Sequence, residues 1–281
     1  MIKILKVSGL SSAAWYDKRP RKVCKASPGP KPAHTEAEIL YRVKELLLEP
    51  EFYGEGYKKL KKRLANLDIR VGKERLRRIL SENNLLATQR AEPNGSGRLH
   101  DGSITTMEPN RMWGTDIKEF YIKGKKHYII SVIDHFNGEI HGYNVTAQAN
   151  RFTVLQALHN AVMKCFHNLE KDVCRESGLQ LRADHGSQFD SKTYAAELAF
   201  LGITPSPAFV RSPQCNGIVE RYHRTLNEQV FYLMSFEDIE QARYAIDLFV
   251  EKYNQRGLYH RLGLRSPQQY RLEYEENGLV R

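Results

Sequence analysis

Cysteine is scarce in this 281-residue sequence, and its thiols form no pattern that would let them act together. The four cysteines are Cys24, Cys165, Cys174 and Cys215, and no two of them form a CxxC pair. Zinc sites and redox motifs usually place two cysteines a few residues apart. The spacing therefore argues against both kinds of site and favours reduced thiols in a cytosolic protein.

Long hydrophobic runs are also missing. A membrane-spanning helix needs about 18 or more consecutive apolar residues, and no segment approaches that length. The opening residues MIKILKVSGLSS have too short an apolar stretch for a secretory signal. We therefore expect no membrane partner. No leucine heptads precede residue 35, so multimerisation is expected to depend on another part of the chain or on another protein.

Positive charge is abundant, with a net charge of +10, but it is unevenly distributed. Residues 1–100 contain 22 Lys and Arg against 11 Asp and Glu, whereas residues 101–281 contain 21 against 22. A basic module joined to a nearly neutral one is typical of a nucleic-acid-binding segment attached to a second domain.

Residues 1–34 are predicted to be a basic, poorly structured lead with a short helix near residues 10–16. It ends in RPRKVCKASPGPKP, whose four prolines and many cations prevent it from forming a core. Two interpretations stay open for this lead: a solvated linker, or an arm that follows the DNA backbone.

Residues 35–86 are predicted to form a small all-α, helix-turn-helix-like DNA-binding domain. Thr35 and Glu38 have the spacing of a capping box, and apolar residues at helical spacing predict three helices separated by glycine-containing turns. The last helix can lie in the major groove, and its expected DNA contacts are Lys73, Arg75, Arg77 and Arg78. The alternative is a three-helix bundle whose cations are merely solvated.

Residues 87–112 lack apolar periodicity and read as a linker, after which the pattern changes to strands. Strands are expected at 113–122, 127–134, 139–146, 179–184 and 203–207, and helices at 152–166, 191–201, from 219, within 235–251 and after Pro267. Three strands in a meander followed by alternating helices and strands predict an α/β domain with a mixed sheet.

Three carboxylates stand out on these elements. Asp116 lies on the first strand, Asp184 at the end of the fourth, and Glu220 at the start of a helix. Carboxylate oxygens suit Mg²⁺, and two such ions can activate the attacking oxygen and stabilise the leaving oxygen in phosphoryl transfer. We therefore predict a site for this chemistry, provided that the fold brings the three residues together.

The helix that carries Glu220 lies in the segment SPQCNGIVERYHRTLNE, residues 212–228. Its apolar positions are expected to form one buried face of a continuous helix; they are Val219, Tyr222, Leu226, Val230 and Leu233. Glu220 lies about 100° from Val219, at the edge of this face. Arg221, His223 and Arg224 on the same helix suit a polyanionic ligand such as DNA.

The strings WGTD, ADHGSQF and SPQCNGIVERYHRTLNE, with 35 residues between Asp184 and Glu220, closely resemble the DD(35)E core of retroviral integrases and insertion-sequence transposases. The ending YNQRGLYHRLGLRSPQQY and the helical segment 35–86 also resemble the insertion-sequence-three family. The chain is most similar to the family's second-frame protein, OrfB.

This resemblance implies an RNase-H-like fold over residues 113–275: a mixed five-stranded sheet flanked by helices, with C-terminal helices. Asp116, Asp184 and Glu220 would bind two Mg²⁺ ions, which Mn²⁺ can replace. The implied activity is DNA cleavage by metal-activated water, followed by attack of the freed 3′-hydroxyl on another phosphodiester. The implied partners are double-stranded DNA at element ends and target, further copies of the chain, and an upstream-frame OrfA protein or an OrfA–OrfB fusion. The expected location is the cytoplasm, on the nucleoid.

The sequence departs from the family at Asn227, where a DNA-contacting lysine often stands. Two alternatives to a transposase stay open, namely a nuclease of the same fold that cuts without joining and a non-catalytic DNA-binding regulator. Trp113 could stack on a base or lie in the core. The roles of Tyr253, Asn254, Arg256 and His260 are open between DNA contact and packing.

Overall fold

A computed structural model describes residues 32–49, 52, 55–87, 106–183, 186, 188–206 and 217–277. Three expectations lie outside these residues: the helix near residues 10–16, most of the linker, and the placement of Asp184. The chain divides into two compact units, Met1–Ile39 and Leu40–Arg281. The domain boundaries expected from the sequence therefore stay predictions.

The three predicted N-terminal helices are confirmed as α3 (Glu36–Leu48), α4 (Tyr57–Asn66) and α5 (Lys73–Glu82). Gly56 and Gly72 occupy the N-cap positions of α4 and α5. The inward residues are apolar, as the helical periodicity predicts: Leu60 and Leu64 on α4, and Leu76, Ile79 and Leu80 on α5. Arg63 also faces inward, where its guanidinium donates to both carboxylate oxygens of Glu55 at 2.6 and 2.8 Å.

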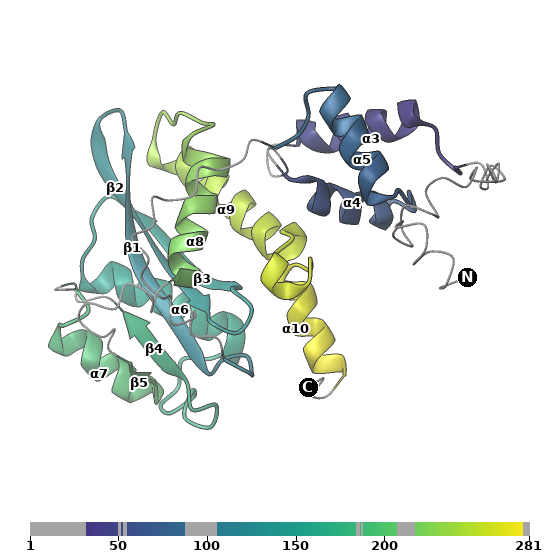
Figure 1. Ribbon diagram of the computed structural model, residues 1–281. Coiled ribbons are helices and arrows are strands. Elements are labelled where there is room, and N and C mark those ends of the chain that lie inside the picture. The colour runs from purple at the N-terminus through teal and green to yellow at the C-terminus, as the bar shows by residue number, and fades with distance from the viewer. Residues whose placement is uncertain are drawn as a thin grey trace, which may run out of the picture. The chain divides into compact units, whose positions relative to one another are not determined.

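The predicted mixed sheet is confirmed (Figure 1). Its strands are β1 (Met112–Ile122), β2 (Lys125–Asp134), β3 (Ile140–Thr146), β4 (Gln180–Ala183) and β5 (Thr204–Pro205), in the order β3-β2-β1-β4-β5. β1, β2 and β3 pair antiparallel, whereas β4 and β5 join them in parallel. This is the arrangement that the RNase-H-like expectation requires, with β1 central.

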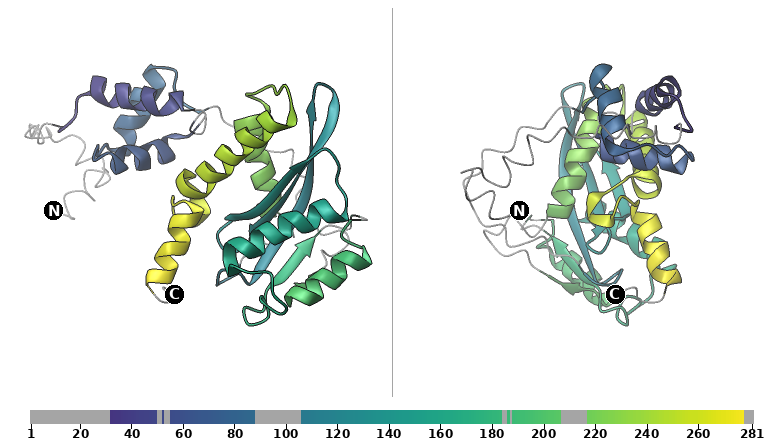
Figure 2. Two further views of the ribbon diagram at one scale, coloured as in Figure 1. Left: turned by 180° about the vertical axis from the view of Figure 1, so that it is seen from behind. Right: turned by 45° about the vertical axis from the view of Figure 1, so that its right-hand side comes forward.

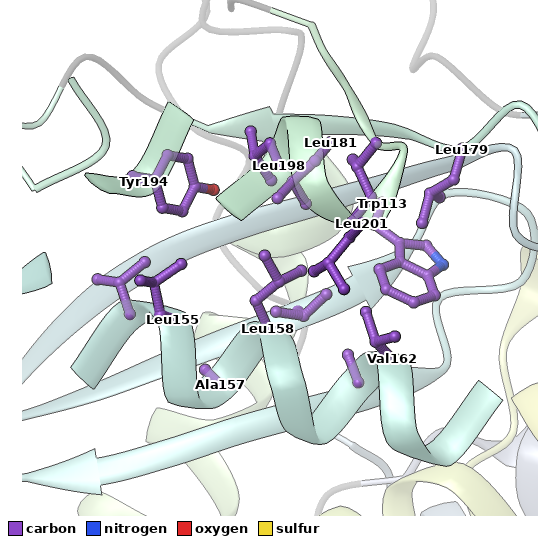
Figure 3. Close-up of a cluster of buried hydrophobic side chains, with 14 of the residues drawn as sticks. Trp113, Leu155, Ala157, Leu158, Val162, Leu179, Leu181, Tyr194, Leu198 and Leu201 are labelled. Carbon is purple, nitrogen blue, oxygen red and sulfur yellow. The ribbon is translucent and has the colours of Figure 1, made fainter. Parts of the chain in front are cut away.

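One face of the sheet is covered by α6 (Arg151–Phe166) and α7 (Lys192–Leu201), which lie in front of it in the left view of Figure 2. The core between the sheet and these two helices includes Trp113, which is fully buried among Leu158, Val162 and Leu179 (Figure 3). Of the two interpretations of Trp113, the core position is therefore confirmed. Its indole N–H donates to the Asn110 side chain at 3.2 Å.

The other face is covered by α8 (Gly217–Leu226), η3 (Asn227–Phe231) and α9 (Ile239–Arg256). Along β1 and β2, the buried residues there alternate with those of the first face, as the two-residue period of a strand requires. The short η4 (His260–Leu262) and α10 (Pro267–Glu276) complete the chain. Within the described residues, no helix combines the length and apolarity needed to cross a membrane.

The prediction of one continuous apolar helix face from Val219 to Leu233 is wrong at its last residue. Residues Asn227–Phe231 form a π-helix, which has five rather than four residues per hydrogen-bonded turn and rotates all later residues around the axis. Val230 is still buried, but Leu233 is 46% exposed. The predicted helix has 3.6 residues per turn as far as Leu233, but the observed helix changes to a π-turn at Asn227 and ends at Phe231, so Leu233 lies in the turn that follows.

The C-terminal motif folds back on the turn between β2 and β3. Asn254, near the end of α9, both donates to the carbonyl and accepts from the N–H of Ile140, each at 2.9 Å. Arg261 donates to the carbonyls of His135 and Phe136 at 3.3 and 3.0 Å. Tyr253 is buried among aromatic rings. Packing therefore accounts for Tyr253 and Asn254. The helix α9 ends at Arg256, later than the predicted limit at residue 251.

Candidate active site

Asp116 lies in the middle of β1, on the sheet face that α8 covers. Its Oδ1 accepts a hydrogen bond from the N–H of Ile117 at 2.8 Å, and its side chain is 27% exposed. The backbone contact fixes one carboxylate oxygen, while the exposure leaves the group accessible to a ligand.

Two contacts hold α8 against this part of the sheet. Gly114 has no side chain to separate the elements, and the position that its Cβ would take lies only 3.0 Å from Cγ2 of Val219. Ser131, which pairs with Asp116 across β1 and β2, donates from its hydroxyl to that of Tyr222 at 3.2 Å. Val219 and Tyr222 flank Glu220 in sequence, so both contacts place the start of α8 beside Asp116.

The polar face of α8 points away from this packing. Glu220, Arg221 and Arg224 are exposed, and Glu220 and Arg224 are one helical turn apart on the same side. Asn227 is partly buried at the start of η3. The acid, predicted at the edge of the buried face, and the two arginines are therefore all exposed to solvent.

His223 lies between α8 and β1. Its Nδ1 is 3.5 Å from Oδ2 of Asp116 and its side chain is only 13% exposed, whereas its Nε2 is buried without a hydrogen-bond partner. Burial, together with the charge of Lys118, lowers the pKa of His223 to about 4. The neutral ring therefore faces the Asp116 carboxylate.

Lys118 is a site residue that the sequence reasoning missed. It lies two residues after Asp116, so strand alternation places both on the face toward α8. Burial lowers its pKa, although the Asp116 charge opposes that shift. The two-residue period of a strand could have identified Lys118, because residues 116 and 118 of one strand lie on the same face.

Asp184 lies outside the described residues. β4 ends at Ala183, which pairs with Thr115, the residue before Asp116. Within the described part of the chain, which leaves out Asp184, no three His, Cys, Asp or Glu side chains are grouped so as to hold a metal ion. The convergence of all three acids stays a prediction.

The residues that are described fit a hard divalent cation. Asp116 and Glu220 offer carboxylate oxygens from a strand and from the helix packed on it, which is the donor type that Mg²⁺ prefers. The Asp116 side chain is 27% exposed and Glu220 is exposed. Both acids are thus placed on packed elements with accessible oxygens.

The predicted DNA contacts of the helical segment are on the surface of α5. Lys73, Arg77 and Arg78 are exposed and Arg75 is partly buried. Three of these cations also lie near acids of the same helix: Lys73 and Arg77 are each 3.7 Å from Glu74, and Arg78 is 3.4 Å from Glu82. Exposed pairs of this kind are weak, so the cations can exchange these partners for phosphate.

Solved retroviral integrases are among the structures similar to this chain. The HTLV-2 integrase catalytic core domain in complex with magnesium, in its trimeric form, is 16% identical with a TM-score of 0.45, covering 59% of this chain and 98% of that one. A chain in the structure of the simian T-cell lymphotropic virus intasome in complex with PP2A regulatory subunit B56 gamma is 15% identical with a TM-score of 0.49, covering 79% of this chain and 74% of that one.

Sequence comparison gives a more specific result. Two family models described as "Integrase core domain" match residues 107–213 and 201–267. Transposase InsD for insertion element IS2A/D/F/H/I/K from Escherichia coli is 29% identical over 260 residues, covering 89% of this chain and 84% of that protein. The InsD transposase of insertion element IS2D from Escherichia coli strain K12 matches to the same extent. With integrase-core matches reaching from residue 107 to 267 and transposase similarity over most of its length, the chain belongs to the insertion-element transposases of the integrase-core, DDE type.

Proposed function

We propose that this transposase is a metal-dependent polynucleotidyl transferase that cuts DNA at the ends of an insertion element and joins the freed 3′-hydroxyl to target DNA. One observation carries the proposal: α8 is packed across β1 so that Glu220 and Asp116 lie on adjoining elements, with two exposed arginines beside the glutamate.

In this proposal, Asp116, Asp184 and Glu220 hold two Mg²⁺ ions, which Mn²⁺ can replace. When bound, such ions activate the attacking oxygen and stabilise the leaving oxygen. Water attacks in the cutting step and the DNA 3′-hydroxyl attacks in the joining step, with the displaced 3′-oxygen as leaving group each time. The transfer needs no Ser or Tyr nucleophile. The His223 ring, neutral and close to Asp116, supports the orientation of that carboxylate.

The DNA contacts are proposed for two places. Arg221 and Arg224 bind backbone phosphates next to the acids, and α5 binds a separate part of the element end through its surface cations. We further propose that the enzyme works as a homo-multimer on DNA, with or without an OrfA protein, and that it acts on the nucleoid.

The test uses labelled oligonucleotides that carry the element end, with Mg²⁺ or Mn²⁺. Asp116→Asn, Asp184→Asn and Glu220→Gln should each abolish cutting and joining while leaving thermal unfolding close to that of the wild type. Glu251→Gln, an exposed acid on α9, is the matched control and should stay active. Full strand transfer by any of the three site variants would remove that residue from the site.

The products also separate the alternatives. Joined products identify a transposase, whereas cut ends that are never joined identify a nuclease. DNA binding with neither product, under both metals, would identify a non-catalytic regulator.

A further inference from the structure

The strand β1 packs along the helical segment formed by α8 and η3, and contacts between the two recur at regular intervals. Gly114 faces Val219, and two residues further along β1, Asp116 faces His223. Phe120 then stacks on Phe231, with ring centroids 4.8 Å apart and an angle of 18° between the rings. Successive same-face positions of the strand therefore meet successive turns of the helix.

Lys118 is the remaining position in this series. It lies on the same strand face as Asp116 and about 7 Å further along, since each strand residue advances roughly 3.3 Å. The corresponding level of the helix lies between His223 and Phe231, and its polar side carries Asn227, which has no charge. At this level, the positive charge near Asp116 is therefore that of Lys118 on β1 and does not come from the helix.

Lys118 is partly buried and lies within the electrostatic influence of Asp116. Among the residues that the structure describes, no Asp or Glu forms a direct salt bridge with its ammonium group. Neighbouring lysines of the β1–β2 hairpin differ: Lys123 pairs with Glu237, and Lys126 lies 3.0 Å from Glu119. A partly desolvated ammonium group that no described carboxylate contacts directly is suited to bind an external anion.

We propose that Lys118 binds a backbone phosphate of the DNA strand held at Asp116, next to the bond that reacts. The proposal rests on the proposed function, because it takes the DNA held at the catalytic acids as its ligand. It specifies a contact from β1, in addition to those of Arg221 and Arg224 on α8.

The test measures DNA affinity against salt concentration and strand-transfer rate, for the full chain with a labelled element-end duplex. Lys118→Met should lower the strand-transfer rate about 10- to 100-fold, as expected for loss of one charge-assisted contact. It should also reduce the slope of log affinity against log salt by about 1, the value expected for one lost phosphate contact. Lys118→Arg should keep the slope.

Two further variants make the result specific. Lys125→Met removes an exposed lysine from the start of β2 and should change neither rate nor slope. The double variant Lys118→Met/Asn227→Lys returns the charge from the helix and should recover most of the lost slope. If Lys118→Met fails to fold, Lys118→Gln replaces it.

The results distinguish failure of the proposed function from failure of the Lys118 contact. A wild-type protein that neither cuts nor joins DNA refutes the proposed function. An active wild type with an unchanged slope in Lys118→Met refutes the Lys118 contact alone. A slower Lys118→Met with the wild-type slope also refutes it, since the lysine would then act without binding phosphate.

Discussion

Replacing Gly114 with alanine is expected to push α8 away from β1 and so separate Glu220 from Asp116. The new Cβ would lie 2.8 Å from His135 Nε2 and 3.0 Å from Val219 Cγ2. Carbon atoms at their preferred separation are about 3.5–4.0 Å apart, so Val219 must move by roughly 0.5–1 Å. A valine in a helix has one strongly preferred rotamer, and Val219 is fully buried, so the backbone of α8 must move with it.

Two separate losses follow from this displacement. Overpacking of a buried contact destabilises a protein by about 1–3 kcal/mol, which should lower the free energy of unfolding by that amount. A misplacement of about 1 Å can reduce the rate about 100-fold. Activity should therefore fall far more than the fraction of folded protein does.

The assay combines urea unfolding with strand transfer on a labelled element end. Gly217→Ala is the control, because it lies on the same helix with no atom within 4 Å of its added Cβ, and alanine favours a helix over glycine by up to about 1 kcal/mol. It should be as stable as the wild type or more so, and active. Wild-type stability and rate in Gly114→Ala would show that α8 does not depend on close approach at this glycine.

Three further predictions concern stability. Asn254→Ala should lower the free energy of unfolding in urea by about 1–3 kcal/mol, since it leaves the N–H of buried Ile140 unpaired, while the carbonyl keeps its hydrogen bond from Lys164. Burial alone would lower the pKa of His141, but its contacts with Asp134 and Cys165 outweigh this and raise it to about 9. The resulting stabilisation is therefore complete below pH 6.5 and lost as the pH rises through 9, by up to roughly 3 kcal/mol; His141→Gln should abolish this pH dependence of urea unfolding. Arg182→Leu should leave thermal stability unchanged or raise it by about 1–4 kcal/mol, because two buried guanidinium nitrogens of Arg182 lack partners; a clear loss of stability would contradict this.

The sheet could be predicted because its strands obey a short-range rule. β1 alternates between its two faces, so Trp113 enters one core while Asp116 faces α8. Lys123 and Gly124 both adopt positive φ in the turn that follows, and a glycine at such a turn is visible in the sequence. The existence of the strands, the antiparallel meander and the mixed sheet therefore followed from local pattern together with the family resemblance.

The π-turn at Asn227–Phe231 could not be predicted in this way. Its last residue, Phe231, stacks on Phe120 of β1 and meets Phe236 edge to face, and such tertiary contacts are not visible in the local sequence pattern. The role of Asn254 was inaccessible for a similar reason. Its partner Ile140 is 114 residues away, and no local pattern connects the two.

The charge distribution shows why single cations near Asp116 matter. Residues 101–281 carry 21 Lys and Arg against 22 Asp and Glu, so this part of the chain offers DNA almost no net attraction. Many of its cations are paired with acids, as Lys126 is with Glu119. We therefore expect much of the attraction to come from the few cations near the acids that form no direct salt bridge with a described carboxylate, namely Lys118, Arg221 and Arg224. Losing one of them should cost this transposase more than losing one of the many cations in residues 1–100.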